Sequence, residues 1–371
     1  MVNARISGHH DATERTRAGF RRWYAARAPN EQEKRGQVLR YIIYGAGGIG
    51  GTIGGRLFQA GHDVVLIARG AHLQAIRERG LLLRTPEGDH QLPIPVAGHP
   101  REVDFATGDV VFLTMKTQDT ELALRDLELA AGTAIPVICA QNGVENERLA
   151  VRRFANVYAM LVALPATFLE PGEVIASATP FSGALHACRY PSGSDQVLVD
   201  VCAALRGARF LSDAEPLAMQ LKYRKLLHNL GNALEIVTHQ AAWGAGGALG
   251  ELAGKLREEA VRCYAAAGII ATPADEYVER VQRHYKSVPV GGSPRSGSST
   301  WQSVLRGHTT VEVDYLNGEI VLLGALHGIP TPYNSIVRRL AVAAARAGGD
   351  GVPLSVEALA ELIESESAPQ T

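Results

Sequence analysis

The 371-residue chain lacks the features that define several large classes of protein. It has no uninterrupted apolar run near the ~18 residues that a membrane span needs, since the longest candidate, Val157–Leu169, is broken by Pro165. Its 37 basic and 38 acidic residues leave no excess of positive charge, so neither nucleic acid nor an anionic membrane is an expected partner. Hydrophobic residues make up 46% of the chain, as in ordinary globular proteins. The membrane-spanning and disordered classes are therefore excluded.

Cysteines are too few and too scattered to predict a structural site. The four of them are far apart and form no C-x-x-C pair, which argues against a zinc site and against a disulfide framework. Such sparse cysteines fit a reducing compartment, and the first residues lack the apolar segment of a secretion signal. We expect a cytoplasmic protein without a metal. The cysteines are Cys139, Cys188, Cys202 and Cys263.

The first 37 residues differ in composition from the rest of the chain. They hold few aliphatic side chains and many arginines, which fits either an arm that binds nucleic acid or targets the protein, or a poorly ordered extension. Asp11, Glu14, Glu31 and Glu33 dilute the basic charge. This mixture favours the extension, with one short helix around Glu14–Ala26.

Residues 38–213 alternate between strands and helices. Strand Val38–Tyr44, helix Gly50–Ala60 and strand Val64–Ala68 make one βαβ unit. A helix over Thr120–Leu129 and further strands follow. This order predicts an α/β fold, a Rossmann-like doubly wound sheet with helices on both faces. The further predicted strands are Val110–Met115, Ile135–Ala140, Val157–Leu164, Gly172–Ser177 and Gly183–Arg189.

From about Pro216 the strand pattern stops and helical periodicity takes over. Residues 214–347 therefore form an all-helical C-terminal domain, interrupted by a Gly- and Ser-rich loop at Val288–Ser299. Residues 348–371 form a tail with one short amphipathic segment, and no internal repeat is visible. The predicted helices are Leu217–Ile236, Gly250–Gly268, Ala274–Tyr285, Thr310–Leu326 and Asn334–Ala347.

A G-x-G-x-x-G motif directly follows the first strand. It is weak alone in a chain with 39 glycines, but its place between a buried strand and a helix gives it a mechanism. Gly45 permits the tight turn, Gly47 the approach of a pyrophosphate, and Gly50 close packing of helix on strand. The helix N-terminus supplies N–H groups and positive charge. The predicted cofactor-binding residues are Gly45, Ala46, Gly47, Gly48, Ile49 and Gly50.

The residue after the second strand indicates which dinucleotide is bound. An acidic residue there would bind a ribose 2′-hydroxyl, but the sequence has Ala68-Arg69-Gly70. The guanidinium of Arg69 can instead hold a 2′-phosphate. The predicted cofactor is therefore NADP(H).

Polar residues follow two more strands and recur on one helix. Lys116 and Asn142 stand at strand ends, where ligands of open α/β sheets bind, although a solvated lysine and a turn asparagine would explain them too. Lys225 and Asn229, with Asn232 at i+7, are predicted to share one face of a strongly apolar helix. A substrate pocket would explain polar groups there. A lysine that reaches the surface is the alternative.

Together these residues resemble the ketopantoate reductase family, the NADPH-dependent 2-dehydropantoate 2-reductases. The resemblance runs from about Val38 to Ala347 and rests on the motifs above, joined by the segment Glu312–Gly318. It implies that Lys225 is the catalytic lysine and Glu312 its acidic partner at the substrate. On pattern alone, Glu312 could equally be an acidic residue near a helix start.

The resemblance also implies further site residues. Lys116 and Asn142 would line the nicotinamide and substrate cleft, and Asn142, Asn229 and Ser299 would bind substrate. Three positions depart from the family pattern on the substrate side: Ala233 replaces a second helix asparagine, Ser303 an aspartate, and Trp301 is bulkier than usual.

The implied reaction is reduction of a 2-oxo acid, with 2-dehydropantoate as the expected substrate. Lys225 would stabilise the developing alkoxide and protonate it; burial would lower its pKa and Glu312 would raise it. Two alternatives stay open: an NADP-dependent oxidoreductase of the same plan acting on another oxo acid, and a sensor that binds NADPH without turnover. The expected partner is a small oxo acid, and a homodimer is possible.

Overall fold

The structure is a computed structural model, and it describes residues 39–242, 244–291, 297–305, 307, 311–347 and 352–367. The predicted extension (1–37) lies outside the described residues, as do parts of the predicted loop at 288–299 and of the tail. Among the described residues, no helix is both long enough and apolar enough to cross a membrane.

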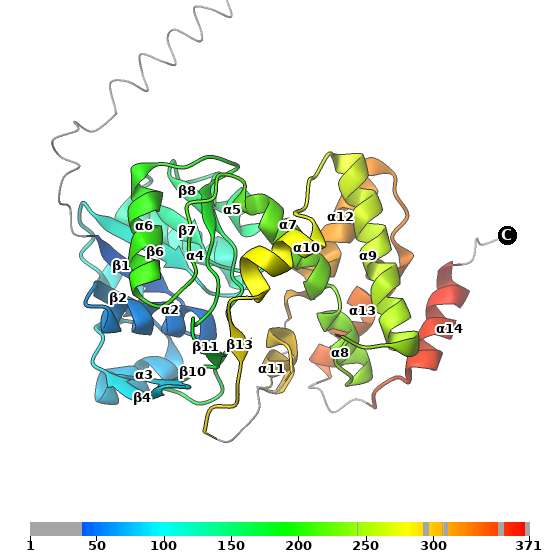
Figure 1. The fold of residues 1–371 in the computed structure, drawn as a ribbon, viewed down its shortest axis with the longest axis horizontal. Helices are drawn as coiled ribbons and strands as arrows, with labels where there is room; N and C mark the ends of the chain where they lie inside the picture. The colour runs from blue at the N-terminus through cyan, green and yellow to red at the C-terminus, as the bar shows by residue number, and fades with distance from the viewer. Residues whose placement is uncertain are drawn as a thin grey trace, which may run out of the picture. The chain divides into compact units, whose positions relative to one another are not determined.

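The first half is built on a seven-stranded sheet with the order β12-β8-β7-β6-β1-β2-β5 (Figure 1). Six of these strands run parallel and only β12 is antiparallel to its neighbour β8. The strands are β1 (Arg40–Tyr44), β2 (Asp63–Ile67), β5 (Val96–Ala97), β6 (Asp109–Leu113), β7 (Val137–Cys139), β8 (Val157–Met160) and β12 (Ala187–Arg189). The helices of this half are α2 (Gly48–Gln59), α3 (Gly70–Arg79), α4 (Thr117–Ala131), α5 (Asn146–Ala150) and α6 (Gln196–Gly207).

Both faces of this sheet are covered, because successive side chains of a strand point to opposite sides. Ile43 and Phe112 lie in one core with side chains of α2 and α6. Ile42 and Val111 lie in a second core with side chains of α4 and α5. All four are fully buried, as expected for a parallel sheet with helices on each face. The predicted doubly wound, Rossmann-like sheet is confirmed.

A second, four-stranded sheet with the order β4-β3-β10-β9 was not predicted. The expected strand Gly172–Ser177 belongs to it and not to the main sheet, because β10 pairs in parallel with β3. Helix α2 lies between the two sheets: a Cβ on Gly54 would meet Leu66 of the main sheet at 2.7 Å, and one on Gly51 would meet Val174 at 2.7 Å. The strands are β3 (Leu81–Thr85), β4 (Gly88–Leu92), β9 (Ala166–Thr167) and β10 (Glu173–Ala176).

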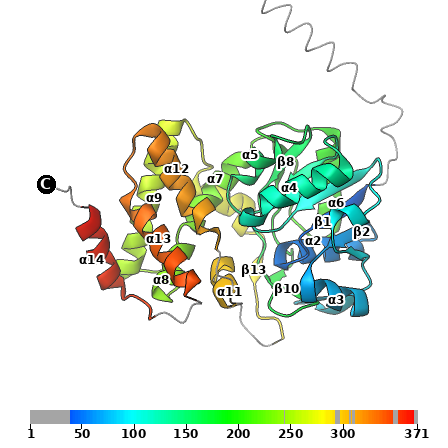
Figure 2. The same cartoon turned by 180° about the vertical axis from the view of Figure 1, so that it is seen from behind.

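Helices dominate the second half (Figures 1 and 2). Leu256 and Ala260 of α9, Ile320 of α12 and Val337 of α13 are fully buried in its core. The helices are α7 (Ala218–Asn229), α8 (Asn232–Thr238), α9 (Gly247–Ala267), α10 (Ala274–Tyr277), the π-helix η2 (Val278–Gln282), α11 (Ser299–Leu305), the 3-10 turn η3 (Glu312–Tyr315), α12 (Asn317–His327), α13 (Pro332–Arg346) and α14 (Val356–Ser367). One short strand, β13 (Lys286–Ser287), pairs with β11 (Ala178–Thr179).

Two of the predicted helices are wrong in detail. The helix expected over Leu217–Ile236 is two helices, because α7 ends at Asn229 and α8 begins after Gly231, a poor helix former. Asn232 is thus the first residue of α8 and no part of α7, and its amide donates to Thr300 Oγ1 at 3.4 Å. The helix expected from residue 310 begins only at Asn317, after the 3-10 turn that holds Glu312.

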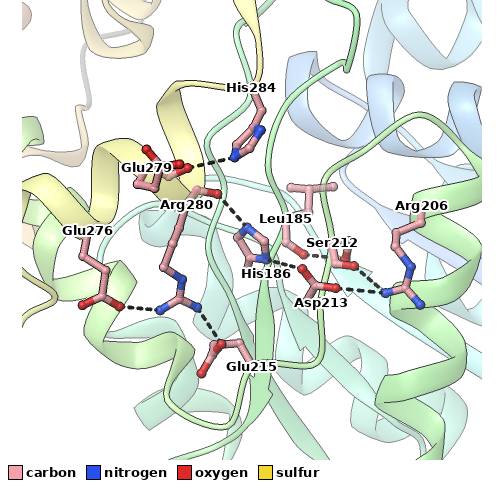
Figure 3. A network of polar contacts seen from close by, with 10 residues as sticks. All are labelled: Leu185, His186, Arg206, Ser212, Asp213, Glu215, Glu276, Glu279, Arg280 and His284. Atoms are coloured by element: carbon pink, nitrogen blue, oxygen red, sulfur yellow. Dashed lines mark hydrogen bonds and ion pairs between the residues drawn. The ribbon is translucent and has the colours of Figure 1, made fainter.

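A polar network fastens the segment that links the two halves (Figure 3). Arg280 of η2 donates to Glu215 at 2.6 Å and to Glu276 at 2.8 Å. His186, which is buried, lies 3.4 Å from the Arg280 carbonyl oxygen and 3.6 Å from Asp213. The network joins η2 to His186, which directly precedes β12, and to Glu215, which follows α6.

The close packing around α2 predicts the effect of replacing Gly50 with alanine. A Cβ at Gly50 would lie 2.2 Å from the carbonyl oxygen of Gly45 and 2.4 Å from Thr114 Oγ1, so backbone must move. We expect Gly50→Ala to lower the free energy of unfolding by about 2–3 kcal/mol in urea denaturation. Gly254→Ala on α9, where a Cβ meets nothing within 4 Å, is the control and should be neutral or stabilising. Equal stability of both variants would contradict the packing argument.

Candidate active site

The glycine loop joins the ends of three strands. Gly45 has φ +109°, and a Cβ there would lie 2.7 Å from the backbone nitrogen of Met115 at the end of β6. The N–H groups of Gly45 and Ala46 donate to the Ile67 carbonyl oxygen of β2 at 3.0 and 3.2 Å. Only glycine combines this backbone conformation with this approach.

The ligand side of the loop is open. Gly47 is the N-cap residue of α2, and a Cβ added to it would meet only Phe168, at 3.9 Å. Backbone N–H groups in the first turn of a helix have no partner within the helix, and the helix dipole favours an anion there. The N–H of Gly47 donates to the Gly45 carbonyl oxygen at 2.8 Å, so the N–H groups of Gly48, Ile49 and Gly50 are the ones that could hold the pyrophosphate of a dinucleotide.

A buried histidine, His72, holds this loop by a hydrogen bond and was not singled out in the sequence analysis. Nε2 of His72 lies 2.8 Å from the Ala46 carbonyl oxygen, and Nδ1 accepts the N–H of Gly172 at 2.8 Å. Nδ1 is therefore the unprotonated nitrogen and Nε2–H the donor. Burial lowers the pKa of His72, and the ring of Phe168 lies 4.5 Å away. The neutral imidazole holds the glycine loop to the second sheet.

Arg69 lies beyond the end of β2, as the sequence predicted. It is the N-cap residue of α3, and its side chain is 81% exposed. Its guanidinium forms an ion pair at 3.1 Å with Asp119, in the first turn of α4. A carboxylate therefore lies beside Arg69, although it comes from another helix and not from the end of β2.

Lys116 and Glu312 lie at the same end of the sheet. Thr114 Oγ1 donates to the Gly45 carbonyl oxygen at 2.7 Å, which places the Thr114–Lys116 segment against the glycine loop. Lys116 is the half-buried N-cap residue of α4. Glu312 is 7% exposed and accepts from the N–H of Thr117 at 3.2 Å and from its hydroxyl at 3.3 Å. Glu312 thus neutralises the N-terminus of α4.

Lys225 and Asn142 come together from the two halves of the chain. Nζ of Lys225 donates to Asn142 Oδ1 at 2.8 Å and also to the Val162 carbonyl oxygen. These residues and Asn229, one turn along α7, line a polar pocket with about 10 Å³ of free space, room for one water molecule. The structure thus brings Asn142, which the sequence placed at a strand end, to the helix that carries Lys225 and Asn229.

The remaining predicted substrate residue is Ser299. It begins α11, and its side chain lies outside the described part of the chain. The next residue, Thr300, is buried against α8, where it accepts the hydrogen bond of Asn232. Ala233, which departs from the family pattern, is fully buried in the helical core and contributes packing alone.

The segment that carries Asn142 is held by residues that the sequence analysis passed over. Gln141 Nε2 donates to the Met115 carbonyl oxygen at 2.9 Å and to Thr120 Oγ1 at 2.8 Å. Asn146 Nδ2 donates to the Asn142 carbonyl oxygen at 3.2 Å. Lys222, three residues before Lys225, also reaches this segment. The sequence did contain a signal for this contact, because Lys222 is a second lysine on the same apolar helix as Lys225.

Fold and site together define a class of protein: an oxidoreductase with a glycine-loop sheet domain and a helical half that brings a lysine to the carboxyl ends of the strands. The family model described as "Ketopantoate reductase PanE/ApbA" matches residues 41–185, and its C-terminal counterpart matches residues 218–345. The chain belongs to the ketopantoate reductase family. It is an enzyme of the type that acts on CH–OH groups, and its reaction is of the oxo-acid reduction type.

Several relatives of this family match the chain along almost their whole length. A 2-dehydropantoate 2-reductase of Pyrococcus horikoshii is 26% identical over 319 residues, which are 84% of this chain and 99% of the relative. A solved PanE/ApbA family ketopantoate reductase of Ralstonia eutropha JMP134 has a TM-score of 0.70 at 28% identity, over 84% of this chain and 99% of that one. D-mandelate dehydrogenase with NADH and anilino(oxo)acetate shares the fold, with a TM-score of 0.71 at 22% identity over 84% and 99% of the two chains. The predicted domain boundary near residue 213 stays a prediction.

The buried His72 predicts a dependence of stability on pH. Because its pKa in the folded protein is lowered by burial, the unfolded chain takes up a proton that the folded chain does not, once the pH falls below about 6.5. The stability that the folded protein gains from a neutral, buried His72 is present above pH 6.5 and is lost as the pH falls. We expect His72→Gln to be less stable than the native chain by about 1–3 kcal/mol at pH 8 but to lose less stability between pH 7 and 5. Urea unfolding at four pH values measures this, and parallel curves would rule out a neutral His72.

Proposed function

We propose that the protein reduces a 2-oxo acid to a 2-hydroxy acid with NADPH, and that 2-dehydropantoate is its substrate. The observation that carries this proposal is the hydrogen bond of 2.8 Å between Lys225 Nζ and Asn142 Oδ1, at the same end of the sheet as the glycine loop. Such an arrangement brings a proton donor to the place where the reacting end of a bound dinucleotide is expected.

In this proposal the dinucleotide is held by the first half of the chain. The glycine loop and the first turn of α2 bind the pyrophosphate, Arg69 binds the 2′-phosphate, and Lys116 and Asn142 line the nicotinamide end. NADPH, when bound, supplies the hydride. Four buried cysteines that form no disulfide are consistent with a cytoplasmic location, which we propose as well.

Lys225 acts on the oxygen of the substrate. Its ammonium stabilises the negative charge that develops when the ketone carbon is reduced, and then donates a proton to that oxygen. Asn142 Oδ1 orients the ammonium, while Asn229 and Ser299 are the proposed partners of the substrate's carboxylate or hydroxyl groups. Glu312 lies at the N-terminus of α4, where its carboxylate accepts hydrogen bonds from the N–H and the hydroxyl of Thr117.

The pocket must widen when substrate binds. Its free space of about 10 Å³ holds one water molecule and no oxo acid. Lys225 must exchange its hydrogen bond to the Val162 carbonyl oxygen for one to the substrate. Substrate therefore displaces Lys225 Nζ from the Val162 carbonyl oxygen, while the hydrogen bond between Lys225 and Asn142 is kept.

A second candidate, an NADH-dependent reductase of another oxo acid, is favoured by one observation. Asp119 lies 3.1 Å from Arg69, so its carboxylate repels the 2′-phosphate that Arg69 attracts. A panel of 2-oxo acids, each tested with NADPH and with NADH at 340 nm, decides between the two. Binding of cofactor without turnover of any acid would instead support the sensor hypothesis.

The Arg69–Asp119 pair predicts how cofactor preference changes. Arg69→Ala should weaken NADPH binding about 10- to 100-fold, because a charge-assisted contact contributes roughly 1.5–3 kcal/mol, and should change NADH binding little. Asp119→Asn is the matched variant and should strengthen NADPH binding, because it removes the competing carboxylate. Dissociation constants from fluorescence titration measure both. Equal loss of both cofactors in Arg69→Ala contradicts the role of Arg69.

The role of Lys225 predicts a loss of turnover without a loss of cofactor. Lys225→Ala should lower kcat at least about 100-fold, because the acid that protonates the alkoxide is gone. The dissociation constant of NADPH should hardly change. Parallel decreases of kcat and kcat/KM mark an interaction made in the transition state. Lys255→Ala, which removes an exposed lysine paired with Glu258, is the control, and an active Lys225→Ala enzyme would refute the mechanism.

A further inference from the structure

A second lysine on α7 lies beside the proposed acid but is engaged differently. The side chain of Lys222 is 3% exposed, and its Nζ donates to a carboxylate oxygen of Glu147 on α5 and, at 3.1 Å, to the Gln141 carbonyl oxygen. The side chain of Glu147 is fully buried. Lys222 and Lys225 both line the small polar pocket, together with Asn142.

The contact with Gln141 reaches the site directly, because Gln141 precedes Asn142 in the chain. Bonds within the first half already hold this segment at the Gln141 side chain and at the Asn142 carbonyl oxygen. Lys222 adds a bond from the second half. It thereby fixes the distance between α7, which carries Lys225, and the segment that carries Asn142.

Stability alone is a poor explanation for this buried ion pair. The desolvation of two charges offsets much of their attraction. Replacing such a pair with apolar side chains of similar volume therefore often leaves the stability of the protein unchanged. A lysine with fixed partners does, however, restrict geometry: its charge must stay within hydrogen-bond distance of both Glu147 and the Gln141 carbonyl oxygen. The Lys225–Asn142 bond spans the same two elements and needs that geometry.

We propose that Lys222 and Glu147 are a positioning pair for the reaction: they hold residues 141–142 against α7 so that Asn142 keeps the Lys225 ammonium aligned with the substrate oxygen. This inference rests on the proposed role of Lys225. A displacement of about 1 Å at such a site lowers turnover strongly while substrate binding changes less. Lys222 itself touches neither substrate nor cofactor in this role.

The neighbouring residue on α5 supplies a matched comparison. Arg148 forms an ion pair with Glu319 of α12, whose side chain is 3% exposed, and with Glu145 at 2.6 Å. This pair also joins α5 to the helical half, but its bonds lead to α12 and not to α7. Removing the Arg148–Glu319 pair therefore shows how far stability and turnover fall when an ion pair between the halves is lost away from α7.

The experiment compares two double variants, Lys222→Met/Glu147→Leu and Arg148→Met/Glu319→Leu, with the single variant Lys222→Met. The single variant leaves the Glu147 carboxylate buried without its partner, so its melting temperature should fall; the first double variant should regain most of that loss. We expect kcat of the first double variant to stay at least tenfold below the native value, with KM within about threefold. The Arg148 and Glu319 control should keep kcat within about threefold.

Recovery of kcat together with melting temperature in the first double variant would overturn the proposal, because the pair would then be only structural. An equal loss of kcat in the control would overturn it too. A measurement without substrate separates this inference from the proposed function: the acylation rate of Lys225 by an amine-reactive reagent, assigned by peptide mapping. We expect that rate to change several-fold in the first double variant and to stay unchanged in the Arg148 and Glu319 control. An unchanged rate overturns the positioning role, whereas a native enzyme that turns over no oxo acid overturns the proposed function instead.

Discussion

The hydrogen bond between Lys225 and Asn142 is the interaction on which the site depends, because its partners belong to different halves of the chain. Asn142 is placed by β7 and by the bonds that Gln141 and Asn146 make within the first half. Lys225 is placed by α7, which is the first helix of the second half and packs against β8 and β12. In the proposed reaction, Lys225 on one half can protonate a substrate reduced by a cofactor bound to the other half only if this contact forms.

Other contacts bring the halves together around the same point. Glu312 from η3 binds the N-terminus of α4, and a Cβ on Gly143 would lie 3.2 Å from the Tyr315 carbonyl oxygen. Lys222 and Glu147 add a buried ion pair. Two elements of the helical half, α7 and η3, therefore meet the segments that follow β6 and β7. These loops belong to the carboxyl edge of the sheet, where open α/β folds bind their ligands.

The sequence predicted what depends on local pattern and missed what depends on distant partners. The strand–glycine loop–helix unit and the position of Arg69 after β2 were predicted correctly, because buried strands and a glycine motif are local signals. The second sheet was missed because the paired residues of β3 and β10, such as Leu82 and Glu173, are 91 positions apart and meet only in the folded chain. The break at Gly231 was missed because apolar periodicity continues through it. His72, Lys222 and Glu147 carry no motif, and their roles exist only through partners that other elements supply.

The position of α2 between two sheets has a consequence for how this binding site can form. Four of its residues, Gly50, Gly51, Gly54 and Gly55, would each place a Cβ within 3.0 Å of a neighbouring atom, so the helix must keep glycines that cost about 1 kcal/mol each in helix propensity. An isolated strand–helix–strand fragment would gain none of the packing that offsets this cost. The N-terminus of α2, the proposed site for the pyrophosphate, is therefore a property of the assembled domain, and it cannot be transplanted as a short peptide.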